Sequence, residues 1–288
     1  MNYYSKGTER DNHYIPQFLL SGWCNTSDCL TVYSRPNNHV VTSQRNPKST
    51  AFEKNLYSYE NVPPERQHVI ETEFFTPHID TPAASILKKI LEGGFADITT
   101  DERSDFSRFV LSLRARNPGA IELARTKGMQ EISSQLGRDN HEYEAVKSAT
   151  SPDTLIEYVR LNLPALIPNF GISIVPKVIT NPEVGERIFH MPWFLHSFND
   201  TSLDLLLSDR PCILKGNALE GMCIIALPLS PRHLLFISNN EVEMQHLRSM
   251  SPSKVVKLVN KESVIHAVSR IYGTGQQHLG FVEKYLSK

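Results

Sequence analysis

The sequence changes in character near Pro168, and this change limits the folds that are open to it. Before that point apolar residues recur at helical spacing, as in residues 83–91 and 106–113. After it, short segments rich in β-branched and aromatic residues are separated by turn residues, which is typical of an antiparallel sheet. Helices first and strands later indicate an α+β fold rather than an alternating α/β fold. The strands expected in this second part are Ile172–Val175, Ile188–Ser197, Leu203–Leu207, Met222–Leu227 and Leu234–Ser238.

The N-terminal segment predicts a short helix followed by a β-hairpin. Residues 11–23 carry an apolar face, and Pro16 suits the first turn of a helix, where a missing N–H leaves no bond unmade. Leu30–Tyr33 and Val40–Thr42 are short extended segments, and the turn-forming sequence Arg-Pro-Asn-Asn lies between them. We therefore expect these two segments to pair.

Helices are expected through the middle of the chain and again at its end. A helical pattern begins at Gln67, and we expect Pro77 to interrupt it because proline lacks the N–H that an interior helical position donates. A helix that starts near Thr100 is expected to end at Asn117, since the residue before a proline disfavours the α conformation. The apolar spacing over 255–271 predicts the terminal helices. The predicted fold has a short N-terminal helix and hairpin, central helices, and a mainly antiparallel C-terminal sheet followed by helices.

Length and charge set further expectations. A chain of 288 residues is close to the size at which one hydrophobic core stops growing. We expect a single domain, residues 1–288, in which a helical part of about residues 1–165 packs against a sheet-containing part of about residues 166–288. The net charge of −1 lacks the basic excess that is usual in proteins that bind nucleic acid strongly. The N-terminal residues are polar, and no run approaches the roughly 18 apolar residues of a membrane span. These features predict a cytoplasmic protein without a membrane partner.

Several segments, in order along the chain, carry a family resemblance. They are HYIPQFLLSGW (13–23), FEKNLY (52–57), VIETEFF with Asp80 (69–80), LSLRARNP (111–118), LLSDRP (206–211), LPLSPRHLL (227–235) and VKLVNKESVIHAVSRIYG (256–273). Together they resemble a bacterial family known as domain-of-unknown-function family 4238, over nearly the whole chain. The resemblance implies no activity, because that of the family is unknown. This chain also departs from the family pattern, since Leu113 stands where many members carry glutamine three residues before Arg116.

The polar residues within these segments form a set that could bind a metal or take part in catalysis. It holds one imidazole, several carboxylates and a guanidinium, so histidine and carboxylate could bind a divalent metal while arginine holds a phosphate through two hydrogen bonds. We assign His13, Gln17, Arg116 and Asp209 as catalytic candidates, and Glu71 and Asp80 as candidate metal ligands. Glu73 and Ser208 complete the set. The leading hypothesis is a metal-dependent, nuclease-like hydrolase that acts on nucleic acid or a nucleotide. It requires His13, Arg116 and at least one of Glu71, Asp80 and Asp209 to converge in one cleft.

Each candidate also has a structural explanation. His13 could donate a hydrogen bond to a backbone carbonyl where a helix begins. Arg116 could cap the carbonyls in the last turn of its helix. Asp209 could accept hydrogen bonds from the backbone amides of a turn. The sequence contains no HExxH, Walker A or GxSxG motif. The alternative hypothesis is therefore a non-catalytic interaction protein with a protein partner, such as an accessory factor of a bacterial defence or toxin system. A third hypothesis is a zinc-stabilised N-terminal module that uses Cys24 and Cys29, with His13 and His39 nearby in sequence.

Overall fold

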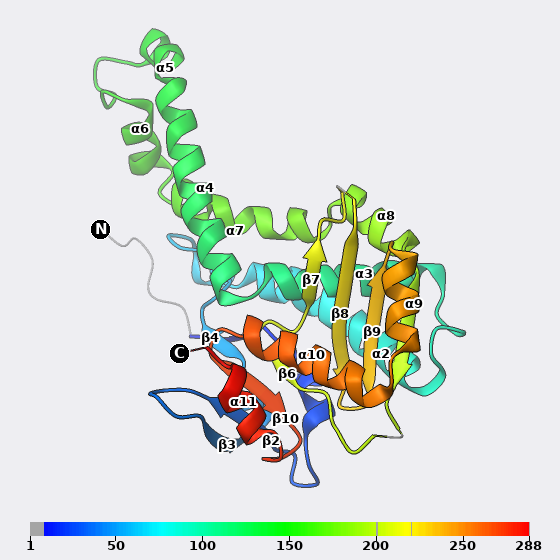
Figure 1. Cartoon of the computed structure of the whole chain (residues 1–288). Coiled ribbons are helices and arrows are strands. Elements are labelled where there is room, and N and C mark those ends of the chain that lie inside the picture. Colours follow the sequence, from blue (N-terminus) through cyan, green and yellow to red (C-terminus); the bar gives the residue numbers. More distant parts are fainter. Residues whose placement is uncertain (1–8, 200, 220, 288) are drawn as a thin grey trace. The chain divides into compact units, whose positions relative to one another are not determined.

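The computed structural model describes residues 9–199, 201–219 and 221–287, and it combines helices with antiparallel sheets (Figure 1). The α+β class predicted from the sequence is thus confirmed. The chain forms two compact units, and each contains separate stretches of sequence. Of the described residues, the first unit holds 9–12, Glu53–His78 and Pro118–Thr180. The second unit holds His13–Phe52, Ile79–Asn117 and the chain from Asn181 onward. That the chain forms one domain, divided near residue 165, stays a prediction.

The first unit is built around two helices that pack closely. Helix α4 (Pro118–Arg138) crosses α7 (Leu166–Ile179) where Gly128 meets Gly171 (Figure 1). A Cβ atom on Gly171 would lie 1.9 Å from the carbonyl oxygen of Ala124, so only glycine fits at this crossing. Helices α5 (Asn140–Val146) and α6 (Leu155–Asn162) connect α4 to α7, and the 3₁₀ turn η3 (Pro64–Arg66) lies earlier in the unit.

The second unit contains two four-stranded antiparallel sheets. One has the order β3-β2-β10-β6 and joins the predicted hairpin, β2 (Leu30–Ser34) and β3 (Val41–Arg45), to β10 (Arg270–Gly273) and β6 (Leu207–Ser208). The other has the order β5-β9-β8-β7. Its strands are β5 (Trp193–Ser197), β7 (Ile213–Gly216), β8 (Cys223–Ser230) and β9 (His233–Ser238).

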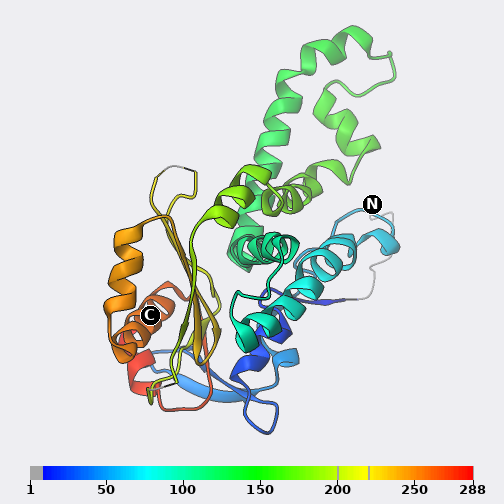
Figure 2. The same cartoon turned by 90° about the vertical axis from the view of Figure 1, so that its right-hand side faces the viewer.

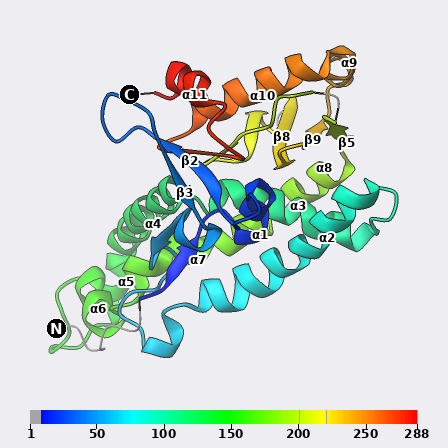
Figure 3. The ribbon, with the colours of Figure 1, turned by 90° about the horizontal axis from the view of Figure 1, so that it is seen from below.

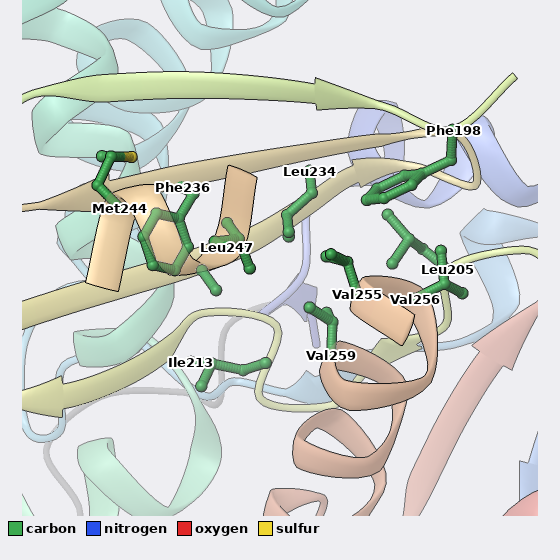
Figure 4. Close-up of a cluster of buried hydrophobic side chains, with 11 residues drawn as sticks. Phe198, Leu205, Ile213, Leu234, Phe236, Met244, Leu247, Val255, Val256 and Val259 are labelled. Atoms are coloured by element: carbon green, nitrogen blue, oxygen red, sulfur yellow. The ribbon is translucent and has the colours of Figure 1, made fainter. Parts of the chain in front are cut away.

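Helices cover both faces of the sheet β5-β9-β8-β7. On one face, α9 (Glu241–Ser249) and α10 (Pro252–His266) bury a cluster that includes Phe236, Leu247 and Val256 (Figure 4). Figure 3, seen from below, shows these two helices along one side of β8 and β9. On the other face, the Trp193 ring lies 6.2 Å from the ring of Phe106 on α3 (Thr100–Ala115). Figure 2 shows the sheet edge-on between these helices.

The remaining helices of the second unit are short or lie at its edges. They are α1 (Gln17–Leu20), the 3₁₀ turns η1 (Ser21–Trp23) and η2 (Pro47–Ser49), α2 (Thr81–Gly93), α8 (Pro182–His190) and α11 (Leu279–Tyr285). Helix α3 begins as predicted, because Thr99 and Glu102 exchange hydrogen bonds between side chain and backbone in a capping box. It ends at Ala115, so the break expected before Pro118 is confirmed.

Three predicted elements are wrong in the N-terminal half. Residues 11–23 do not form one helix: β1 (Asp11–His13) pairs with β4 (Phe52–Lys54), and the helix begins only after Pro16. Pro77 does not interrupt the helix, because the turns around it are π-helical in η4 (Ile70–Asp80), which continues into α2. The expected strand Ile172–Val175 lies inside α7, where packing against α4 outweighs the preference of β-branched residues for strands.

Three further corrections concern the C-terminal half. Ile188–Ser197 is not one strand, since α8 continues to His190 and only Trp193–Ser197 is extended. The terminal helical pattern does not reach Ile271, because Arg270–Gly273 is strand β10 between β2 and β6. Of the expected strand at 203–207, only Leu207 is in a strand, as part of β6.

Candidate functional site

Arg116 lies at the end of α3 and forms a buried ion pair with Asp80. Its side chain has 0% of its surface exposed. Nη1 donates to Oδ1 of Asp80 at 2.6 Å, and Nη2 donates to Oδ2 at 3.1 Å. This two-bond geometry is the strong form of an arginine–carboxylate pair. Asp80 is the residue before α2, so the pair ties the start of α2 to the end of α3.

Arg116 also reaches the N-terminal segment. Its Nη2 donates to the backbone carbonyl of His13 at 2.8 Å. Three segments that are distant in sequence therefore meet at one guanidinium. Of the residues that the hydrolase hypothesis needs together, the structure brings together Arg116, Asp80 and the backbone of His13.

The imidazole of His13 is half-buried, and its two nitrogens have different neighbours. Nε2 lies 3.2 Å from the carbonyl oxygen of Pro47, which can only accept, so Nε2 carries the proton of this bond. Nδ1 lies 3.5 Å from Nε2 of the exposed Gln17, and in the neutral ring it is the acceptor. The ring also packs on Phe52, with centroids 5.4 Å apart. The expected proximity of Gln17 to His13 is thus present, although a turn rather than a helix produces it.

The candidate carboxylates within residues 71–80 do not share one environment. Glu71 belongs to the first unit, where its Oε2 accepts from Asn12 at 3.3 Å and its Oε1 accepts from Thr76 at 3.4 Å. Glu73 is exposed. Asp80 belongs to the second unit, and both its oxygens accept from Arg116. The joint role of Glu71 and Asp80 as metal ligands therefore stays a prediction. Within the described residues, no group of three or more His, Cys, Asp or Glu side chains is arranged to hold a metal ion.

Asp209 joins β6 to the start of β10. It is only 5% exposed, and its carboxylate accepts from the backbone amides of Val268, Ser269 and Arg270 at 2.7–2.9 Å. The hydroxyl of Ser269 donates to it as well, at 3.1 Å. These amides would otherwise be available to continue α10, so Asp209 ends the helix and starts the strand. The neighbouring Ser208 hydroxyl donates to the carbonyl of Arg210 at 2.8 Å.

A buried hydroxyl group beside these residues was missed by sequence reasoning. Tyr272, on β10, is fully buried, and burial raises its pKa well above the usual value. The neighbouring Tyr14 and the charge of Asp209 raise this pKa further, whereas the nearby side chain of Thr50 lowers it. Tyr14 directly follows His13, and Tyr272 belongs to the last matched motif. Both tyrosines thus lie in or beside matched motifs. The sequence alone, however, does not distinguish a tyrosine in a mostly apolar segment from an ordinary core residue.

The cysteines proposed for a zinc module lie at either end of a tight loop. The backbone N–H of Asn25 donates to the carbonyl of Cys29 at 2.8 Å, and both thiols are free and half-buried. His39 lies elsewhere, with its Nδ1 3.8 Å from a carboxylate oxygen of Glu283 and 87% of its side chain exposed. His13 is directed at Pro47 and Gln17. The arrangement thus provides two sulfur ligands, and the zinc module stays a prediction.

The comparisons with known proteins decide the family. A family model described as a protein of unknown function, DUF4238, matches residues 11–276. The chain belongs to this family. The DUF4238 match spans every candidate residue from His13 to Asp209, so the resemblance drawn from the motifs is confirmed. No curated protein and no solved structure matches the chain. Among the described residues of this DUF4238 member, no single helix has the length and apolar composition for a membrane span, although the bent pair Leu155–Asn162 and Leu166–His190 together has both.

Proposed function

We propose that this DUF4238 protein is a hydrolase of phosphodiester bonds in nucleic acid or a nucleotide, with His13 as its general base. The observation that supports the proposal is the bond from the buried Arg116 to the His13 carbonyl. This bond brings Arg116, the Asp80 carboxylate and the backbone of the segment that carries the imidazole together, and the proposal further requires that they serve one cleft. An interaction protein whose matched polar residues served only local caps and turns would leave them dispersed.

The proposal assigns Arg116 and Asp80 a positioning role. A guanidinium without exposed surface cannot meet a substrate phosphate unless the pair with Asp80 opens. Buried ion pairs contribute little net stability compared with apolar residues of similar size, and they are best attested as devices that fix one specific arrangement. Here the arrangement that is fixed is the backbone at His13. We therefore no longer assign phosphate binding to Arg116, and we expect side chains at the surface to bind the phosphate.

The chemistry expected of His13 follows from its neutral form. In the neutral ring Nδ1 has a lone pair, and its contact to the exposed Gln17 amide is long, at 3.5 Å, so that a substrate can displace this amide. In the proposed step, Nδ1 removes the proton from a water or hydroxyl that attacks phosphorus. The P–O bond to the leaving group then breaks, and the imidazolium returns the proton to the leaving oxygen. Gln17 orients the attacking group, and the expected setting is the bacterial cytoplasm.

A cleavage screen tests this function. Purified protein is incubated with end-labelled single-stranded RNA, single-stranded DNA and a dinucleotide, each in Mg²⁺, Mn²⁺ or EDTA. The proposal expects cleavage of at least one substrate, and the EDTA arm reports whether a divalent metal is needed. Intact substrates in every arm contradict it.

The second candidate is a non-catalytic interaction protein of a defence or toxin system. The bonding of Asp209 to three successive backbone amides favours it, because that contact is a structural use of a matched residue. A His13→Ala variant that folds like the wild type but loses turnover excludes this candidate.

A further inference from the structure

The first unit contains a cavity of about 570 Å³ between residues 59–66 and the start of α7. This volume lies within the range of small-molecule sites. Most of the lining is apolar, and two aromatic rings, those of Tyr59 and Phe170, take part in it. Leu163 and Leu166, which line the same cavity, are 52% and 38% exposed. A bound molecule would remove this apolar surface from water.

Hydrogen bonds join the two walls of the cavity. The buried side chain of Asn169 accepts from the amide of Glu60 at 2.8 Å and donates to the carbonyl of the same residue at 2.7 Å. Asn61 donates from its side chain to the carbonyl of Pro164 at 3.2 Å. Because the walls are held by their own bonds, the cavity exists without a ligand, which lowers the ordering cost of binding.

The charge at this cavity is positive. Arg66 lines it with an exposed guanidinium, for which the described residues provide no hydrogen bond or ion pair. Burial raises the pKa of the Tyr59 hydroxyl, while the positive charges of Arg66 and Arg125 act to lower it, which places both guanidinium groups near this hydroxyl. Arg125 is already paired with Glu60 at 3.7 Å. Arg66 is therefore the cation that is available to a ligand.

We propose that this cavity binds a small molecule that joins a planar aromatic ring to an anionic group, as a nucleotide does. The ring packs on Tyr59 and Phe170, as bases do on aromatic side chains in proteins that bind single strands. The anionic group bonds Arg66, whose planar guanidinium suits phosphate. The inference does not depend on cleavage at His13. A free nucleotide and one nucleotide of an RNA strand share this chemistry, and the test below separates them.

Calorimetric titration of the full chain tests the proposal, with AMP, adenosine, inorganic phosphate and an adenylate pentanucleotide as probes. AMP is expected to bind at least about tenfold more tightly than adenosine or phosphate, because each of these lacks one half of the recognised group. Tighter binding of the pentanucleotide than of AMP identifies a strand as the source, and equal or weaker binding identifies a free nucleotide. The absence of binding by both AMP and the pentanucleotide overturns the proposal.

Three variants locate the site. Arg66→Gln is expected to weaken AMP binding by about tenfold or more, and Ser173→Trp, at an exposed lining position, is expected to abolish binding by filling the cavity. Arg160→Gln, which removes an exposed guanidinium of α6 outside the lining, is the matched control and should bind like the wild type. Thermal melts confirm folding. Wild-type affinity in both lining variants, or a loss of binding in His13→Ala alone, overturns the proposal. Failure of the cleavage screen with AMP binding intact leaves it standing.

Discussion

Arg116 and Asp80 form a two-bond ion pair in which the guanidinium has no exposed surface, and the same guanidinium bonds the backbone of His13. The pair is 36 residues apart in the sequence. Its three bonds fix the relation between the N-terminal segment and two helices, so removing either partner should affect more than one contact.

Replacement of Arg116 tests this relation. Arg116→Met leaves Asp80 without its countercharge and the His13 carbonyl without its donor, so unfolding should require about 3–5 kcal/mol less free energy. Arg114→Met, two residues earlier on the exposed side of α3, is the control and should change stability little. Urea unfolding measures both. The double variant Arg116→Met, Asp80→Leu should lose less than the sum of the single variants, because it removes both charges together. Additive losses would show that the two side chains are not coupled.

Replacement of Asp209 tests the junction between α10 and β10. Asp209→Asn replaces one accepting oxygen by an NH₂ group that faces backbone donors, so the free energy of unfolding should fall by about 2–3 kcal/mol. Hydrogen exchange should speed up at the amides of Val268, Ser269 and Arg270. Asp153→Asn, at an exposed position, serves as the control. Unchanged exchange at these three amides would contradict the contacts described above.

The crossing of α4 and α7 predicts a sharp contrast between two glycines. Gly171→Ala places a methyl group against the carbonyl of Ala124, so the helices must separate, and we expect a loss of at least about 2 kcal/mol. Gly137→Ala, on the exposed end of α4, has no atom within 4 Å of the added Cβ and should raise stability by about 0.5–1 kcal/mol. Chemical unfolding of the two variants gives the comparison. Equal effects would show that the crossing is looser than described.

The cysteines predict a pattern of reactivity. Burial raises the pKa of the Cys212 thiol to about 12, so at pH 8 the native protein holds almost none of it as thiolate, the reactive form. Iodoacetamide should modify Cys24 and Cys29, which are half-buried, before Cys212. Because this pKa is raised on folding, the stability that the thiol contributes is complete below its unfolded pKa of about 8.5 and declines as pH rises toward about 12. Rapid labelling of native Cys212, measured by peptide mass spectrometry, would contradict its burial.

The sequence predicted elements well where local chemistry determined them. The start of α3 at Thr99 and its end before Pro118 follow from capping and from proline sterics, and the β2–β3 hairpin follows from its turn sequence. Where distant packing determined the structure, local patterns failed. The β-branched segment at Ile172 is helical because Gly171 lies against α4, and Ile271 is extended because Asp209 holds the amides before it.

The sequence motifs predicted which residues meet better than they predicted what each residue does. The motifs identified His13, Asp80 and Arg116, and the fold brings these together. That Arg116 is buried and paired could not be read from its position in a last helical turn, because the partner lies in a segment expected to be broken at Pro77. The acceptor for His13, the carbonyl of Pro47, belongs to the backbone and leaves no pattern in the sequence.

The measurement that tests the account most directly is the rate of substrate cleavage by a His13→Gln variant beside a His39→Gln control, an exposed histidine of the same unit. Loss of a general base typically lowers turnover by about 10²–10⁴-fold. We predict a loss in this range for His13→Gln, in a protein that a thermal melt shows to be folded, and wild-type turnover in His39→Gln. Wild-type turnover in a folded His13→Gln protein would contradict the central claim that the Arg116 and Asp80 pair holds a functional imidazole in place.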